Sequence, residues 1–216
     1  MKFEAIVFDF DGVLVESADV KTQAFAELYS SCGEAVVQRV VDYHLTHAGV
    51  SRYVKFKVWQ EQFLGITYTE ADGERLSTQF SRLVVERIVA APYVTGALEF
   101  LDAYSGVVPL YVASGTPTDE LHEIIKRRNM THYFAGIYGT PDTKGAILKS
   151  IVRGNRYATA SVVMIGDAMA DLDGAKEAGI PFVGRDMAGQ GIFPSGTPII
   201  KDLSQLESVL RLTTES

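Results

Sequence analysis

The sequence predicts an α/β fold: a doubly wound, Rossmann-like parallel sheet with a small α-helical cap domain inserted after the first strand. Two observations lead to this prediction. From residue 92 onward, short and continuously apolar runs alternate with segments of helical periodicity, as in a parallel sheet buried on both faces. Residues 16–91 instead show helical periodicity and no convincing strand pattern. We therefore expect an α/β core at 1–15 and 92–216 and a helical cap at 16–91.

The predicted strands are short apolar runs. The first is EAIVF at residues 4–8, and it is followed at once by Asp9. The later ones are VVPLYVAS (107–114), YFAGIYG (133–139), SVVMIGD (161–167) and IPFVG (180–184). The helical segments around them are TGALEFLDAYSG (95–106), PTDELHEIIKRRN (117–129), TKGAILKSIV (143–152) and MADLDGAKEAG (169–179). This alternation is typical of βαβ units.

The predicted cap contains four helical segments: TQAFAELYSSCG (22–33), AVVQRVVDYHLTHAG (35–49), RYVKFKVWQEQFLG (52–65) and EADGERLSTQFSRLVVERIVAA (70–91). Aromatic residues recur every three or four positions in the third segment, at Tyr53, Phe56, Trp59 and Phe63, which predicts a packing face inside the cap. Cys32 lies in the first segment, where we expect a buried packing role. Pro92 follows the last segment and ends the cap.

Composition and charge exclude several classes of partner. The net charge is −7 and no dense lysine or arginine block offsets it, so nucleic acid is not an expected partner. No apolar stretch reaches the roughly 18 residues of a membrane span, and the N-terminus lacks a signal-peptide pattern. The chain has 1 cysteine, which cannot form an intrachain disulfide and fits a reducing compartment. We expect a cytoplasmic protein that binds neither nucleic acid nor membranes.

Polar residues follow four of the predicted strands. They are Asp9 and Asp11 after the first, Ser114 and Thr116 after the second, Lys144 at the helix after the third, and Asp167 and Asp171 after the fourth. Each residue taken alone could be a helix N-cap. However, ligands of open α/β sheets bind outside the carboxyl ends of the strands, which is where all four groups belong. The whole set at one edge therefore favours a binding site.

The residue types in this set indicate a metal ion and a phosphate. Clustered carboxylates favour a hard divalent cation, and Mg²⁺ prefers oxygen ligands. Asp9 and Asp11 are two apart, so in an extended chain their side chains point the same way, and a cation would offset the paired charges. Lys144 and the helix start at Ser114–Thr116 supply the positive charge that a phosphate needs. The expected ligand is a small phosphorylated metabolite.

The motifs DFDGVL, SGT, Lys144 and GDAMAD resemble, in this order, the four motifs of the haloacid dehalogenase superfamily, in its branch of Mg²⁺-dependent phosphatases with helical caps. The resemblance covers essentially the whole chain. It implies hydrolysis of a small phosphate monoester, of the phosphoglycolate or sugar-phosphate type, through an aspartyl-phosphate intermediate. The first motif, with DGVLVESA, is similar to that of phosphoglycolate phosphatases.

The resemblance also implies a role for each motif residue. Asp9 would be the nucleophile, and Asp11 would protonate the leaving alcohol and then activate water. Ser114 and Lys144 would hold the phosphoryl oxygens, with Gly115 and Thr116 in the same phosphate-binding motif. The Mg²⁺ ligands would be the side chains of Asp9 and Asp167 and the carbonyl of Asp11, supported by Asp171.

Two alternatives stay open: a β-phosphoglucomutase-like sugar-phosphate mutase and a non-catalytic binding protein on the same fold. The cap loop GVSR at 49–52 resembles that of β-phosphoglucomutase, so Arg52, Lys55 and Lys57 are candidates for binding a second anionic group of the substrate. Lys21 is a further candidate for substrate specificity. Two features differ from the mutases. Lys21 is the nearest match to a histidine expected after the first motif, and the KPxPD pattern around the third-motif lysine is absent, so Lys149 is an alternative to Lys144.

Overall fold

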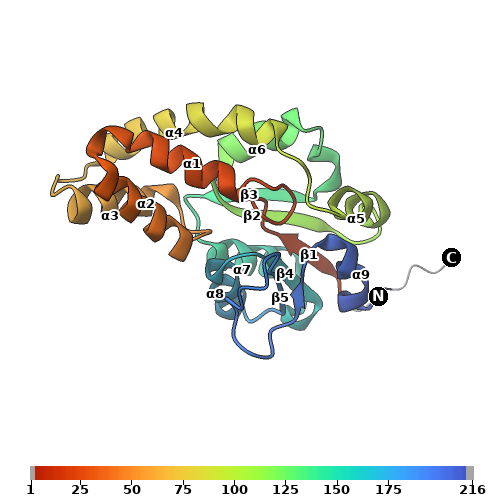
Figure 1. Ribbon diagram of the computed structural model, residues 1–216. Helices are drawn as coiled ribbons and strands as arrows, with labels where there is room; N and C mark the ends of the chain where they lie inside the picture. The colour runs from red at the N-terminus through yellow and green to blue at the C-terminus, as the bar shows by residue number, and fades with distance from the viewer. Residues whose placement is uncertain (1–2, 213–216) are drawn as a thin grey trace.

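The computed structural model describes residues 3–212, and these contain one six-stranded parallel sheet (Figure 1). Its strands, in chain order, are β1 (Ala5–Phe8), β2 (Leu110–Pro117), β3 (Gly136–Thr140), β4 (Val162–Gly166), β5 (Phe182–Arg185) and β6 (Ile199–Ile200). The spatial order is β3-β2-β1-β4-β5-β6, with every neighbouring pair parallel. The order reverses between β1 and β4, which confirms the doubly wound topology and places a ligand crevice at this reversal.

Helices cover both faces of the sheet (Figure 1). Helices α5 (Ala97–Tyr104), α6 (Thr118–Arg127) and α9 (Leu206–Leu210) pack on one face, and α7 (Lys144–Asn155) and α8 (Met169–Ala178) pack on the other. Strand β1 serves both layers, because Ile6 and Phe8 point to the first face whereas Ala5 and Val7 point to the second. This two-sided burial explains why the strands are continuously apolar in sequence.

Of the helices between β1 and β2 in the chain, the first four α-helices form the lobe at the left of Figure 1. They are α1 (Ala18–Leu28), α2 (Glu34–Thr46), α3 (Arg52–Val58), which continues as a π-helical turn at Trp59–Phe63, and α4 (Glu70–Ala90). Phe56 and Trp59 are fully buried there. The Phe25 ring stacks on Phe80 at 4.0 Å and meets the Trp59 ring edge-on at 4.9 Å. The aromatic stripe is therefore packing, as the spacing predicts.

Two local features differ from the sequence-based expectations. Cys32 is exposed, so the expected buried packing role is wrong. The reason is that α1 ends at Leu28, and the chain turns through a 3-10 helix at Ser30–Cys32 that packs no side chain into the core. Strand β6 has no counterpart among the expected strands, because two residues are too short to show a strand pattern. No helix among residues 3–212 is long and apolar enough to cross a membrane. The domain boundaries at residues 15 and 92 stay a prediction.

Candidate active site

Residues from four neighbouring strand ends converge at the carboxyl edge of the sheet. Asp9 follows β1, Ser114 lies in the last half of β2, Lys144 begins α7 after β3, and Asp167 follows β4. Asp9, Ser114 and Lys144 are buried, at 3%, 1% and 7% exposure. The structure thus brings together residues that are more than 150 positions apart in the sequence, as the strand-end pattern predicts.

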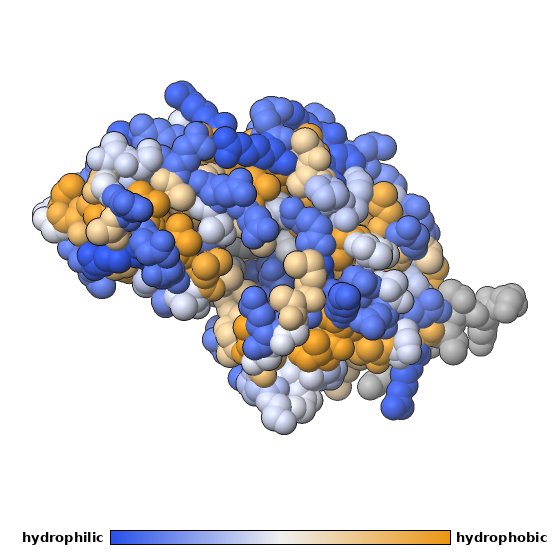
Figure 2. All heavy atoms as spheres, in the orientation of Figure 1, coloured by the Kyte–Doolittle hydropathy of each residue, from blue (hydrophilic) through white to orange (hydrophobic). Residues whose placement is uncertain are grey.

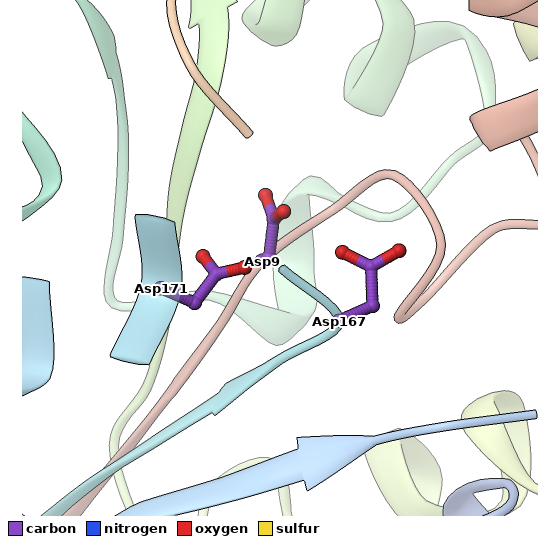
Figure 3. Close-up of side chains that lie close together, drawn as sticks. All are labelled: Asp9, Asp167 and Asp171. Carbon is purple, nitrogen blue, oxygen red and sulfur yellow. The ribbon is translucent and has the colours of Figure 1, made fainter. Parts of the chain in front are cut away.

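Three carboxylates form a cluster that fits a cation (Figure 3). Oxygens of Asp9, Asp167 and Asp171 all lie within 4.8 Å of one another. The Asp167 carboxylate has no hydrogen bond or ion pair with any residue that the structure describes. Burial raises its pKa, and the carboxylates of Asp9 and Asp171 raise it further. An oxygen-rich, like-charged cluster with one unpartnered member is the donor set that Mg²⁺ prefers.

Lys144 is the cation already present at this cluster. Its Nζ lies 2.9 Å from Asp9 Oδ2 and also donates to Asp171 Oδ1. Burial alone would lower the pKa of Lys144, but the carboxylates of Asp171 and Asp9 outweigh it and hold the pKa above its ordinary value. Lys149, the alternative, pairs with Glu177 and is not part of this cluster.

Asp11 faces a different set of partners from Asp9. Its carboxylate accepts hydrogen bonds from Lys21 Nζ at 2.5 Å, Ser17 Oγ at 2.7 Å and Thr116 Oγ1 at 3.2 Å. Burial would raise its pKa, but the Lys21 ammonium and these hydrogen bonds outweigh burial and lower it. The side chain is outside the three-acid cluster, so only its main chain could serve as a metal ligand there.

Two glycines allow the backbone to approach the site closely. Gly12 has a φ of +74°, and a Cβ there would lie 1.9 Å from Asp167 Oδ2. Gly49, in the loop between α2 and α3, also has a φ of +74°, and a Cβ there would lie 3.2 Å from Lys144 Nζ. Any larger residue at Gly12 would displace the Asp167 carboxylate, and the Gly49 loop covers Lys144.

A family comparison decides the identity of this arrangement. Residues 3–179 match the family model described as haloacid dehalogenase-like hydrolase. The chain belongs to this family. The resemblance of its four motifs is thereby confirmed, and the protein is a hydrolase of the haloacid dehalogenase type.

A curated relative and two solved structures are similar to this hydrolase over most of its length. A phosphorylated carbohydrates phosphatase of Thermotoga maritima is 26% identical over 184 residues, which are 82% of each chain. The structure of β-phosphoglucomutase from Clostridium difficile has a TM-score of 0.78 at 18% identity, covering 97% of this chain and 96% of that one. A predicted phosphoglycolate phosphatase from Haemophilus somnus has a TM-score of 0.73 at 18% identity, covering 97% and 99%.

A small cavity of the hydrolase lies between the sheet edge and the helical lobe, at the hollow visible in Figure 2. Its volume is about 60 Å³. The sheet edge contributes acids and two residues of the SGT motif, and the lobe contributes basic and aromatic side chains. The lining includes Asp9, Asp11, Ser114, Gly115, Asp167, Lys21, Phe25, His44, Arg52, Lys55 and Phe80.

The SGT motif of the hydrolase, at residues 114–116, is partly occupied by internal contacts. The Ser114 hydroxyl oxygen accepts a hydrogen bond from the Thr116 amide at 3.1 Å, and the Thr116 hydroxyl donates to Asp11. Gly115 lies under the loop between α2 and α3, since a Cβ there would be 2.6 Å from the Gly49 carbonyl oxygen. Of this motif, Ser114 and Gly115 line the cavity, whereas Thr116 helps to hold Asp11.

The cap residues that the sequence selected for specificity have different surroundings. Arg52 is buried. Its two terminal guanidinium nitrogens donate hydrogen bonds to the Glu120 carboxylate, and Nη1 also donates to Ser81 Oγ. Lys55 is buried beside His44. Lys21 pairs with Asp11. These three residues line the cavity, but Lys21 and Arg52 already have carboxylate partners.

Sequence reasoning missed Glu120, His44 and Ser17. Glu120 precedes Ile124 by four positions, so it falls on the apolar face of α6. A charge on an apolar helix face is a signal of a buried partner, and that signal was present. His44 and Ser17 gave no comparable signal, because their burial depends on how α1 and α2 pack.

Proposed function

We propose that this hydrolase cleaves a small phosphate monoester, of the phosphoglycolate or sugar-phosphate type, through an aspartyl-phosphate at Asp9. The observation that carries the proposal is the position of Asp9, whose carboxylate lies in contact with Lys144 and beside Asp167 and Asp171. The Thermotoga maritima relative supports the substrate class, because it is named a phosphatase of phosphorylated carbohydrates.

The acids fit a bound Mg²⁺ ion, because the unpartnered Asp167 carboxylate needs a cation. The side chains of Asp9 and Asp167 and the carbonyl of Asp11 would hold the ion, and Asp171 would support them. When bound, Mg²⁺ neutralises charge on the phosphoryl oxygens. The remaining chemistry belongs to the side chains.

A carboxylate oxygen of Asp9 attacks phosphorus and forms an acyl phosphate, while the bond from phosphorus to the ester oxygen breaks. Asp11 gives its proton to the leaving ester oxygen, and Lys144 and Ser114 hold phosphoryl oxygens. Water, deprotonated by Asp11, then attacks the phosphorus of the acyl phosphate and restores the Asp9 carboxylate. The contacts of Lys21 suit this second half, since they keep Asp11 ionised and able to accept a proton.

For the first step, in which the phosphoryl group is transferred to Asp9, Asp11 must be protonated. A phosphate dianion brought into the cavity raises the pKa of a neighbouring carboxyl, which favours that state. Substrate binding would thus favour the protonated Asp11 that the first step needs. The phosphate-free enzyme holds Asp11 in the basic form that the second half requires.

The mutase and binding-protein alternatives can be separated from hydrolysis in one experiment. A panel of phosphorylated sugars and short phosphorylated acids is incubated with the parent protein and with Asp9→Asn, each with and without Mg²⁺. Mg²⁺-dependent phosphate release by the parent, absent in Asp9→Asn, is the expected result. An isomerised sugar phosphate without net phosphate release would indicate a mutase. No turnover of any substrate would favour a binding protein.

A further inference from the structure

Arg185 is a buried residue at the end of β5, which pairs with the strand that precedes Asp167. Its Nη1 donates a hydrogen bond to the Gly12 carbonyl oxygen at 2.6 Å. Nη1 and Nη2 also donate to the two carboxylate oxygens of Glu16, at 3.1 and 2.7 Å, and Nε donates to the Lys201 carbonyl oxygen at 3.2 Å. Arg185 thus joins the end of β5 to the loop that follows β1, although none of the four motifs includes it.

The loop at residues 11–16 lies between β1 and α1. The Gly12 amide donates to the Val15 carbonyl oxygen at 2.8 Å, and the Gly12 carbonyl accepts from Arg185. Because a peptide group is planar and trans, the direction of the Gly12 amide also sets the direction of the Asp11 carbonyl. Gly12 is therefore held on both sides, by the turn through its amide and by Arg185 through its carbonyl.

Gly12 depends on such support because of its contact with Asp167. A Cβ at this position would lie 1.9 Å from Asp167 Oδ2, so the close approach requires a glycine. Glycine is also the residue with the widest choice of backbone conformations. The residue type therefore permits the contact without fixing it, and the hydrogen bonds of the Gly12 backbone must fix it instead.

Packing does not replace these hydrogen bonds on the Arg185 side of the loop. A cavity of about 210 Å³ lies there, and Gly12, Glu16, Asp167 and Arg185 are among its lining residues. A loop that borders a cavity lacks the close contacts that hold a segment in a packed interior. The guanidinium group is therefore the restraint on this side of the loop.

We propose that Arg185 is a positioning residue for the metal site. Held by Glu16, it fixes the Gly12 backbone so that the Asp11 carbonyl and the Asp167 carboxylate can bind the same Mg²⁺ ion. The inference rests on the proposed function, because the ion is the one expected at Asp9 and Asp167. An arginine suits this role, since its planar fork can donate to a carbonyl and a carboxylate at once.

The test measures Mg²⁺ binding by calorimetric titration of the protein without substrate. Arg185→Met should weaken Mg²⁺ affinity by about 10–100-fold, the usual effect of removing a group that orients metal ligands. Loss of a positive charge near the ion would by itself strengthen Mg²⁺ binding. A weaker affinity therefore reports lost positioning and not lost charge. An affinity equal to or tighter than that of the parent would overturn the proposal.

Two milder variants grade the effect and remain available if Arg185→Met does not fold. Arg185→Lys keeps the charge but cannot reproduce the fork, so its loss of Mg²⁺ affinity should be intermediate. Glu16→Gln should weaken Mg²⁺ binding less than Arg185→Met, because the bond to the Gly12 carbonyl remains. Since Glu16 acts through Arg185, the double variant Glu16→Gln/Arg185→Met should bind Mg²⁺ as Arg185→Met does. Additive losses would contradict this order of action.

Arg52→Met is the matched control for folding. Arg52 is as deeply buried as Arg185, at 4% against 6% exposure, and it also pairs with a carboxylate, that of Glu120. It makes no contact with the three-acid cluster. Both variants should lower the melting temperature, but only Arg185→Met should lose Mg²⁺ affinity. Equal Mg²⁺ affinities in the two variants would assign Arg185 a purely structural role.

Hydrogen exchange keeps the two proposals distinguishable, because it needs no metal. The Gly12 amide, bonded to Val15, should exchange at least about tenfold faster in metal-free Arg185→Met than in the parent, and no faster in Arg52→Met. If the parent binds no Mg²⁺, the metal site of the proposed function fails, and this exchange rate still decides whether Arg185 fixes the loop. Unchanged exchange of the Gly12 amide would overturn the positioning role.

Discussion

Lys144 and Asp9 form a buried ion pair, with Nζ 2.9 Å from Oδ2, and Lys144 also bonds to Asp171. One ammonium therefore offsets two of three clustered carboxylates. Removing it leaves buried like charges without compensation, which is costly in a low-dielectric site. The fold therefore depends on Lys144 to compensate these acids, in addition to the proposed role of Lys144 in holding phosphate.

We expect Lys144→Met to lower the free energy of unfolding by about 3–5 kcal/mol, the usual effect of breaking a buried pair. Added Mg²⁺ should restore part of this loss, because the ion binds the same acids. Denaturant titrations with and without Mg²⁺ measure both effects. The control is Lys149→Met, because Lys149 lies in the same helix as Lys144 and its ion pair with Glu177 of α8 is partly exposed. This variant should lower the free energy of unfolding by at most about 1 kcal/mol.

Asp11→Asn should reduce kcat/KM for an alkyl phosphate by about 10²–10⁴-fold, since kcat/KM reports formation of the aspartyl phosphate, in which Asp11 is the proposed acid. The loss should be smaller for an aryl phosphate, whose leaving group needs little protonation. Steady-state rates on alkyl and aryl phosphates measure the difference. Asp42→Asn, at an exposed position of α2, should behave as the parent. Equal losses on the two substrate types would exclude Asp11 as the acid.

Gly12→Ala tests the close contact between the backbone and Asp167. Its φ of +74° makes any side chain unfavourable, and the new Cβ would collide with the Asp167 carboxylate. We expect Mg²⁺ affinity to fall at least about tenfold, along with about 1–2 kcal/mol of stability. Gly65→Ala has a similar φ of +68° with nothing within 4 Å, so it should lose only the stability that the positive φ costs and no metal affinity. Mg²⁺-dependent melting temperatures compare the two.

Glu120→Gln should destabilise the protein by about 3 kcal/mol, because it leaves the buried Arg52 guanidinium without its carboxylate. Glu120 lies on α6 and Arg52 on α3, so the loss of this ion pair weakens the contact between the helical lobe and the core. Proteolysis of the α2–α3 loop should become faster. Glu123→Gln, exposed on the same helix, is the matched control and should change stability by less than about 1 kcal/mol. Double-mutant cycles with Arg52→Met measure the coupling.

His44 should make the protein sensitive to acid. Its ordinary pKa of 6.5 falls to about 3 in the folded protein, so between these two values the unfolded chain binds a proton that the folded chain excludes. Stability therefore falls as pH drops below 6.5, by about 2 kcal/mol at pH 5. In His44→Gln this part of the pH dependence should disappear, as measured by unfolding at pH 7 and pH 5. An unchanged difference between the two pH values would show that His44 is not the cause.

Much of the core could be predicted from the sequence because its signals are local. The run EAIVF is continuously apolar, and a strand buried on both faces needs that pattern. Asp9 and Lys144 could be placed at one edge, since parallel strands and their helices fix where each strand end lies. By contrast, the expected burial of Cys32 is wrong because helical periodicity does not show where a helix stops.

The partners of the cap residues could not be predicted in the same way. Arg52 and Lys55 are three positions apart on one helix and look alike in sequence, as basic residues near the loop over the site. In the structure Arg52 meets an acid from α6, whereas Lys55 meets a neutral histidine from α2. Such pairings depend on the packing of separate helices, which no local pattern encodes.

The sequence by itself determined the sheet, the order of the four motifs and the residues brought to the strand ends. The reason is that the periodicity of strands and helices is a pattern among neighbouring residues. The tertiary structure alone decided which charges are compensated. Compensation depends on distances between segments remote in the chain, and a buried charge changes its behaviour completely with the presence or absence of one such neighbour.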